Sequence, residues 1–172
     1  MHRLIGILLV ILGCSGLGIW YRERLLSRIR HLRTLEIILD MFASEVSFGR
    51  TTMPECCLKI SFSVPEPYKE CLRGIFEEAE GDSGRDFMEV FAQRSRAALN
   101  KLPMEDSDLE NFLLFTGHGG LQDREMQLRL LKESRERIGQ TVLLQEKEFA
   151  RKGGLVTGLG VLGGLLLSVI LV

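Results

Sequence analysis

The sequence predicts an all-α protein in which a cytosolic helical bundle lies between an N-terminal and a C-terminal transmembrane helix. Two stretches of the 172 residues contain no charged residue, Leu4–Tyr21 at one end and Gly153–Val172 at the other. All 23 acidic residues and every basic residue except Arg3 lie between them, in residues 22–152. Apolar residues in this middle part recur every three or four positions, and alternating strand patterns are nearly absent. We therefore expect three parts, with transmembrane helices at 4–21 and 153–172 and a helical-bundle domain at 22–152.

Both charge-free segments are long enough to cross a bilayer. A transmembrane helix needs roughly 20 apolar residues, with a lower limit near 17. The first segment ends in Trp20-Tyr21, aromatic residues suited to the headgroup boundary. The second contains two pairs of glycines spaced four apart, a spacing that lets helices approach closely: Gly154 and Gly158, and Gly160 and Gly164.

The first segment has an alternative interpretation as a secretory signal. Met1-His2-Arg3 precedes an apolar run, and Ile11–Cys14 resembles the box at which lipoproteins are cleaved and lipidated. Leu12 is bulky for such a box, and the apolar run continues beyond Cys14, so an uncleaved anchor is favoured. The alternative is a lipoprotein or secreted-side membrane scaffold processed at Cys14.

The basic residues that flank the two segments predict the orientation. Five arginines follow the first segment, two basic residues precede the second, and only Arg3 lies on the other side. Because cytoplasmic flanks are enriched in Lys and Arg, we expect both termini outside and the middle in the cytosol. The membrane-proximal basic residues are Arg22, Arg24, Arg28, Arg30, Arg33, Arg151 and Lys152.

The middle part is expected to form a series of helices joined by short loops. An apolar stripe from Leu25 to Val46 extends the first span into one long helix that ends at Gly49. Thr52 and Glu55 form a capping-box pattern, and so do Ser107 and Glu110. The expected later helices are 52–62, 68–80, 85–101, 107–115, and 122–152 continuing into the second span.

Nothing in the sequence predicts an enzyme, a cofactor or a metal site. The net charge of −1 gives no support to nucleic-acid binding. No phosphate-binding loop is present, and the three histidines lie far apart in the sequence. Adjacent Cys56-Cys57 are expected to be buried apolar residues, with a redox role for the pair as the alternative.

Two short motifs carry a family resemblance. Phe115, Gly120, Asp123 and Gln127 match the pattern Phe-Gly-x-x-Leu-Gly-x-x-Asp-x-x-x-Gln, with Thr116 and Gly119 departing from it. A second match runs from Glu45 to Thr51 and is followed by Pro54-Glu55. In these motifs and in its layout the chain resembles the stage III sporulation protein AB family of endospore-forming bacteria.

The resemblance implies a function that composition and periodicity do not. It implies a helical domain like that of the platform proteins of type II secretion and type IV pilus systems. The expected location is the mother-cell membrane facing the forespore, and the expected partners are other channel subunits and a cytosolic secretion-type ATPase. Self-association as a homo-oligomer is compatible with this role. We therefore expect a non-enzymatic platform or assembly subunit of a secretion-like channel that is required for sporulation.

The candidate partner-binding residues are those of the motif between residues 115 and 127: Phe115, Gly120, Asp123 and Gln127. Asp123 and Gln127 are four apart at the start of the last helix, so they share a face. Two interpretations remain open. Either Asp123 caps the helix and Gln127 bonds to a neighbouring helix, or this turn and Phe115 form an exposed docking groove for the ATPase.

Overall fold

The protein is all-α, as predicted. The computed structural model describes residues 2–48, 51–81, 84–117 and 124–171, and it describes their side chains except at 2–15, 17–19, 21 and 152–171. No strand occurs within these ranges. The elements are α1 (His2–Phe48), α2 (Met53–Ser61), α3 (Tyr68–Glu80), α4 (Phe87–Leu99), α5 (Asp106–Leu113), the 3₁₀ turn η1 (Leu114–Thr116) and α6 (Arg124–Leu171). The chain divides into two compact units, residues 1–29 with 143–172, and residues 30–142.

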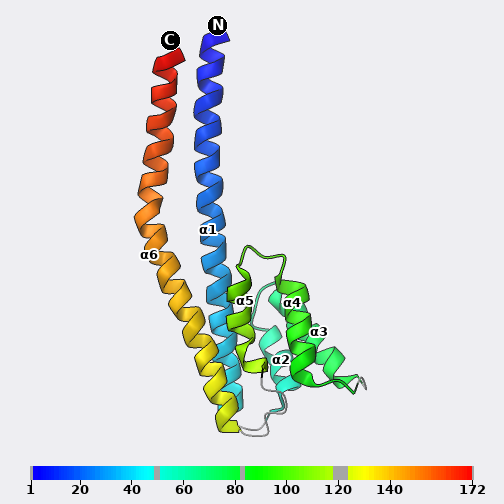
Figure 1. Cartoon of the computed structure of the whole chain (residues 1–172). Helices are drawn as coiled ribbons and strands as arrows, with labels where there is room; N and C mark the ends of the chain where they lie inside the picture. The colour runs from blue at the N-terminus through cyan, green and yellow to red at the C-terminus, as the bar shows by residue number, and fades with distance from the viewer. Residues whose placement is uncertain (1, 49–50, 82–83, 118–123, 172) are drawn as a thin grey trace. The chain divides into compact units, whose positions relative to one another are not determined.

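The 30–142 unit is a helical bundle built on the apolar stripe of α1. Leu32, Leu35, Leu39 and Phe42 are completely buried, and Val46 at the end of the stripe is nearly so. In Figure 1, α3 and α4 lie side by side, and α2 packs against α3. From Leu32 to Val46 the predicted stripe is thus confirmed as the face of α1 that enters the core, whereas Leu25 at its start is only half-buried.

Four phenylalanine rings from different elements fill the centre of this bundle. Phe42 of α1, Phe91 of α4 and Phe112 of α5 are all nearly inaccessible, and so is Phe115 of η1. The ring centroids of Phe91 and Phe115 are 5.1 Å apart, and those of Phe42 and Phe91 are 5.7 Å apart, both edge-on. Edge-to-face pairs at such distances are favourable beyond the area they bury. The rings therefore hold α1, α4, α5 and η1 together.

Helix ends agree with the predicted bounds to within two residues, as at α4, which is Phe87–Leu99 and not 85–101, and one predicted cap needs correction. The capping box at Thr52 and Glu55 is confirmed, and α3 has the predicted bounds. The second capping box was placed wrongly at Ser107, because Glu105 is the N-cap of α5 and Asp108 closes the box. The carboxylate of Asp108 accepts a hydrogen bond from the backbone N–H of Glu105 at 2.9 Å. The predicted end at Phe115 falls in η1, which follows α5 directly.

The other unit contains the beginning of α1 and the end of α6. α1 is helical without interruption from His2 to Phe48, as expected of a single long helix. Among the residues whose side chains are described, no helix has the length and apolar character needed to cross a membrane. The segments 4–21 and 153–172 lie almost wholly outside that set, so their spanning of a membrane stays a prediction. The glycines at 154, 158, 160 and 164 also lie outside it.

Candidate partner-binding end of the bundle

The two motif segments meet where α1 ends and α6 begins. Arg124, the first residue of α6, donates from Nε to the carbonyl oxygen of Val46 at 2.8 Å and from Nη2 to that of Ser47. The last turn of α1 contains no basic residue of its own. A cation at a helix C-terminus is stabilising because the last carbonyls carry partial negative charge. Arg124 therefore caps α1 from a position 77 residues further along the chain.

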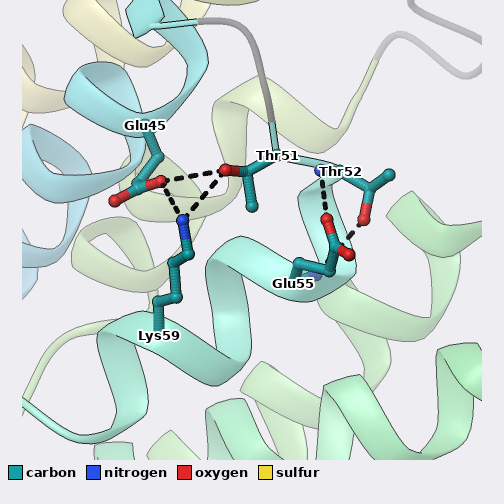
Figure 2. Close-up of polar contacts among 5 residues, drawn as sticks. All are labelled: Glu45, Thr51, Thr52, Glu55 and Lys59. Carbon is teal, nitrogen blue, oxygen red and sulfur yellow. Dashed lines mark hydrogen bonds and ion pairs between the residues drawn. The ribbon is translucent and has the colours of Figure 1, made fainter.

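A polar cluster joins the same end of α1 to α2 (Figure 2). Lys59 Nζ donates to Glu45 Oε2 and to Thr51 Oγ1, each at 3.0 Å. Thr51 in turn donates to Glu45 Oε2 at 3.3 Å. These three residues join the last turns of α1 to Thr51 and to α2.

The capping box completes this end of the bundle. The backbone N–H of Thr52 donates to Glu55 Oε2 at 2.9 Å, and the N–H of Glu55 points back to Thr52 Oγ1 at 3.5 Å. Hydrogen bonds from Thr52 lower the pKa of Glu55, so the carboxylate form needed by the box is favoured. We call Glu45, Thr51, Thr52, Glu55, Lys59 and Arg124 the polar frame.

Two apolar side chains are exposed beside the polar frame. Phe48 follows Ser47 directly and is 80% exposed, and Met126 lies two residues after Arg124 and is 41% exposed. Because Arg124 bonds to Ser47, both side chains belong to the same end of the bundle. Phe48 was not among the predicted partner-binding residues, although it lies within the motif at Glu45–Thr51 and off the buried stripe of α1.

The predicted partner-binding residues fall into three situations. Phe115 is completely buried in the aromatic core, so the expectation of an exposed groove containing Phe115 is wrong. Its ring instead packs against Phe42, Phe91 and Phe112. Gln127 lies in the first turn of α6 and is half-buried. Gly120 and Asp123 lie outside the described residues, so both interpretations of Asp123 stay predictions.

The cysteines of the bundle are held as unreactive thiols. Cys56 and Cys57 are completely buried, Cys71 is nearly so, and all three are free. Burial raises the pKa of Cys56 and of Cys71 to about 11, and it also raises the pKa of Cys57. Because the thiolate is the reactive form, this environment disfavours the alternative of a redox pair at Cys56-Cys57. Elsewhere in the part of the chain that is described, no three side chains of the metal-binding types come together.

Most of the predicted membrane-proximal basic residues are exposed. Arg22, Arg24, Arg30, Arg33 and Arg151 are open to solvent, and Arg28 is half-buried. The side chain of Lys152 lies outside the described set.

The comparison with known families decides the assignment. The model of the family described as stage III sporulation protein AB matches residues 3–172. The chain belongs to this family. The resemblance seen in the two motifs is thereby confirmed, and a role in sporulation follows for this member of the stage III sporulation protein AB family.

Similar proteins agree with the assignment over nearly the full length. Stage III sporulation protein AB of Bacillus subtilis (strain 168) is 22% identical over 172 residues, which cover 99% of each chain. A solved structure of stage III sporulation protein AB matches with a TM-score of 0.66 and 18% identity, and the match covers 72% of this chain and 97% of that one. At that identity the solved structure shows the shared fold alone.

Proposed function

We propose that this chain is a non-enzymatic membrane platform subunit of a secretion-like channel between mother cell and forespore. Membership in the stage III sporulation protein AB family supports the sporulation context. The charge-free segments at 4–21 and 153–172 support anchoring at both ends of the chain. In this arrangement the 30–142 unit lies in the mother-cell cytosol, where it docks a secretion-type ATPase and meets other channel subunits.

The observation that carries the docking proposal is Phe48 exposed beside the polar frame. Large aromatic side chains dominate binding energy when a partner buries them. The backbone that presents Phe48 is fixed by the hydrogen bonds of Arg124, from α6, to the end of α1 and by the contacts of Glu45 with Lys59 and Thr51. A preorganised surface loses less conformational freedom on binding, which favours affinity. We therefore place the ATPase on Phe48 and Met126.

The chain offers a matched control for this proposal. Phe62 is 75% exposed, like Phe48, but it is the C-cap residue of α2 and so lies at the opposite end of that helix from Thr52. The experiment captures tagged full-length protein from detergent-solubilised sporulating cells and quantifies the ATPase recovered with it. Phe48→Ala should reduce recovery roughly 10-fold or more, the scale of an interface hot spot, and Phe62→Ala should leave it unchanged. Equal recovery with wild type and Phe48→Ala would contradict docking at this end.

A further inference from the structure

Basic side chains of α1 and α6 lie together in the unit formed by residues 1–29 and 143–172. The guanidinium carbon of Arg22 lies 5.6 Å from the centroid of the Phe149 ring, so this part of α1 contacts α6 two residues before Arg151. Arg24 on α1 and Lys147 and Arg151 on α6 are exposed, as is Arg22. We call Arg22, Arg24, Lys147 and Arg151 the basic collar.

The two arginines of α1 are held by aromatic rings. The guanidinium of Arg24 lies 5.6 Å from the centroid of the Trp20 ring, and Trp20 is itself 58% exposed. A guanidinium within about 6 Å of a ring centroid is attracted by the ring, and its N–H donors can bind phosphate in a fork. Arg22 has the same arrangement on Phe149. The rings therefore help to hold both guanidinium groups near the boundary before any ligand arrives.

The local charge balance favours an anionic ligand. Residues 22–30 carry four arginines against Glu23 as the one acidic residue. Residues 146–152 carry three basic residues against Glu146 and Glu148. Trp20 lies at the end of the charge-free segment 4–21 that is next to the collar, and tryptophan favours the boundary between headgroups and acyl chains. With residues 4–21 anchored in the bilayer as proposed above, these donors would lie at the depth of the lipid phosphates.

We propose that the basic collar binds the headgroups of anionic phospholipids and enriches them around this protein. This inference rests on the proposed anchoring of the chain in the membrane. The phosphate oxygens accept from the guanidinium groups of Arg22 and Arg24, which lie over aromatic rings, while Lys147 and Arg151 add attraction from α6. A zwitterionic lipid offers the same phosphate without the net charge, so it is bound less well.

The single tryptophan of the chain makes the proposal measurable. Full-length protein is reconstituted into bilayers in which either phosphatidylglycerol or phosphatidylcholine carries brominated acyl chains, which quench a nearby indole. Quenching of Trp20 by the brominated anionic lipid, relative to the brominated zwitterionic lipid, gives the ratio of association constants. We expect a ratio of about three to five in favour of phosphatidylglycerol, the scale of a basic residue at an anionic surface.

Charge-matched variants separate the collar from the net charge. Arg22→Gln with Arg24→Gln should bring the ratio close to one. Arg73→Gln with Arg96→Gln removes the same charge from exposed positions on α3 and α4 and should leave the ratio at the wild-type value. A wild-type ratio of one, or an unchanged ratio in the Arg22 and Arg24 double variant, would overturn the collar while leaving the anchor in place. Absence of quenching by either lipid would instead overturn the anchoring of residues 4–21 itself.

Lysine variants test the role of the guanidinium groups of Arg22 and Arg24 that lie over aromatic rings. Arg22→Lys with Arg24→Lys keeps the charge but removes the planar guanidinium groups, whose paired N–H donors bind phosphate in a fork. We expect the preference for phosphatidylglycerol to fall at least two-fold. A preference equal to that of wild type would overturn the part assigned to Phe149 and Trp20.

Discussion

Replacing Phe115 with alanine should strongly destabilise the 30–142 unit. The side chain is completely buried, and its ring lies 5.1 Å from that of Phe91, 6.1 Å from Phe42 and 6.3 Å from Phe112. Truncating a buried phenylalanine costs about 3–5 kcal/mol, because the transfer free energy is lost and a cavity remains. Domains of this kind are stable by about 5–15 kcal/mol, so the loss is a large share of the total.

Reactivity of the buried Cys57 thiol gives an assay that works in detergent. Full-length protein is incubated at increasing urea concentrations, alkylated briefly, and the fraction modified at Cys57 is measured by mass spectrometry. Cys57 is inaccessible in the folded unit, so alkylation reports its unfolding. With a urea dependence of about 2 kcal/mol per molar, the midpoint of Phe115→Ala should fall by about 2 M.

A conservative variant and an exposed phenylalanine supply the controls. Phe115→Leu fills most of the space and should lower the midpoint by less than half as much. Phe62→Ala removes an exposed ring and should change the free energy of unfolding by no more than about 0.5 kcal/mol. A Phe115→Ala variant that unfolds at the wild-type urea concentration but no longer recovers the ATPase would refute the assignment of Phe115 to the core. That result would restore the docking interpretation of this residue.

Three further predictions concern the cap on α1, pH and orientation. Arg124→Met should lower the free energy of unfolding by about 0.3–1 kcal/mol in the same assay, because the C-terminus of α1 loses its cation; an unchanged midpoint would contradict this. Burial and, after it, Arg30 lower the pKa of His31 below 6.5, so the unfolded chain binds this proton more tightly. As far as His31 is concerned, the free energy of unfolding should therefore be highest above pH 6.5 and should fall as the pH drops toward 5. His31→Gln should flatten this pH dependence. A cysteine at the exposed position of Ser107 should resist an impermeant maleimide in intact cells and react after lysis; labelling in intact cells would exclude a cytosolic location.

Features encoded within a few residues could be predicted from the sequence. Thr52 and Glu55 form their box because donor and acceptor lie three residues apart, and the stripe on α1 follows from helical periodicity alone. The box on α5 was misplaced because Ser107 is the more usual cap, whereas Glu105 and Asp108 form it here.

Features that depend on the meeting of distant segments could not be predicted. The burial of Phe115 requires Phe42 and Phe91 to arrive from other helices, and no spacing in the sequence encodes that. For Arg124 the sequence contains a weak indication of a distant partner. A basic residue in the first turn of a helix is disfavoured by the dipole of that helix, so its presence suggests a compensating contact. The partner that compensates this cost lies at the end of α1 and became apparent only from the fold.

The contact made by Arg124 has a consequence for how this family can diverge. Its acceptors are the main-chain carbonyls of Val46 and Ser47, and every amino acid supplies such a carbonyl. Substitutions at 46 and 47 therefore leave the hydrogen bonds intact, whereas a substitution at 124 removes them. The constraint acts on one position only, so the two segments will not covary through this contact. A search for correlated substitutions among relatives will pass over the junction of α1 and α6, even though it joins the two motifs that carry the family resemblance in this sequence.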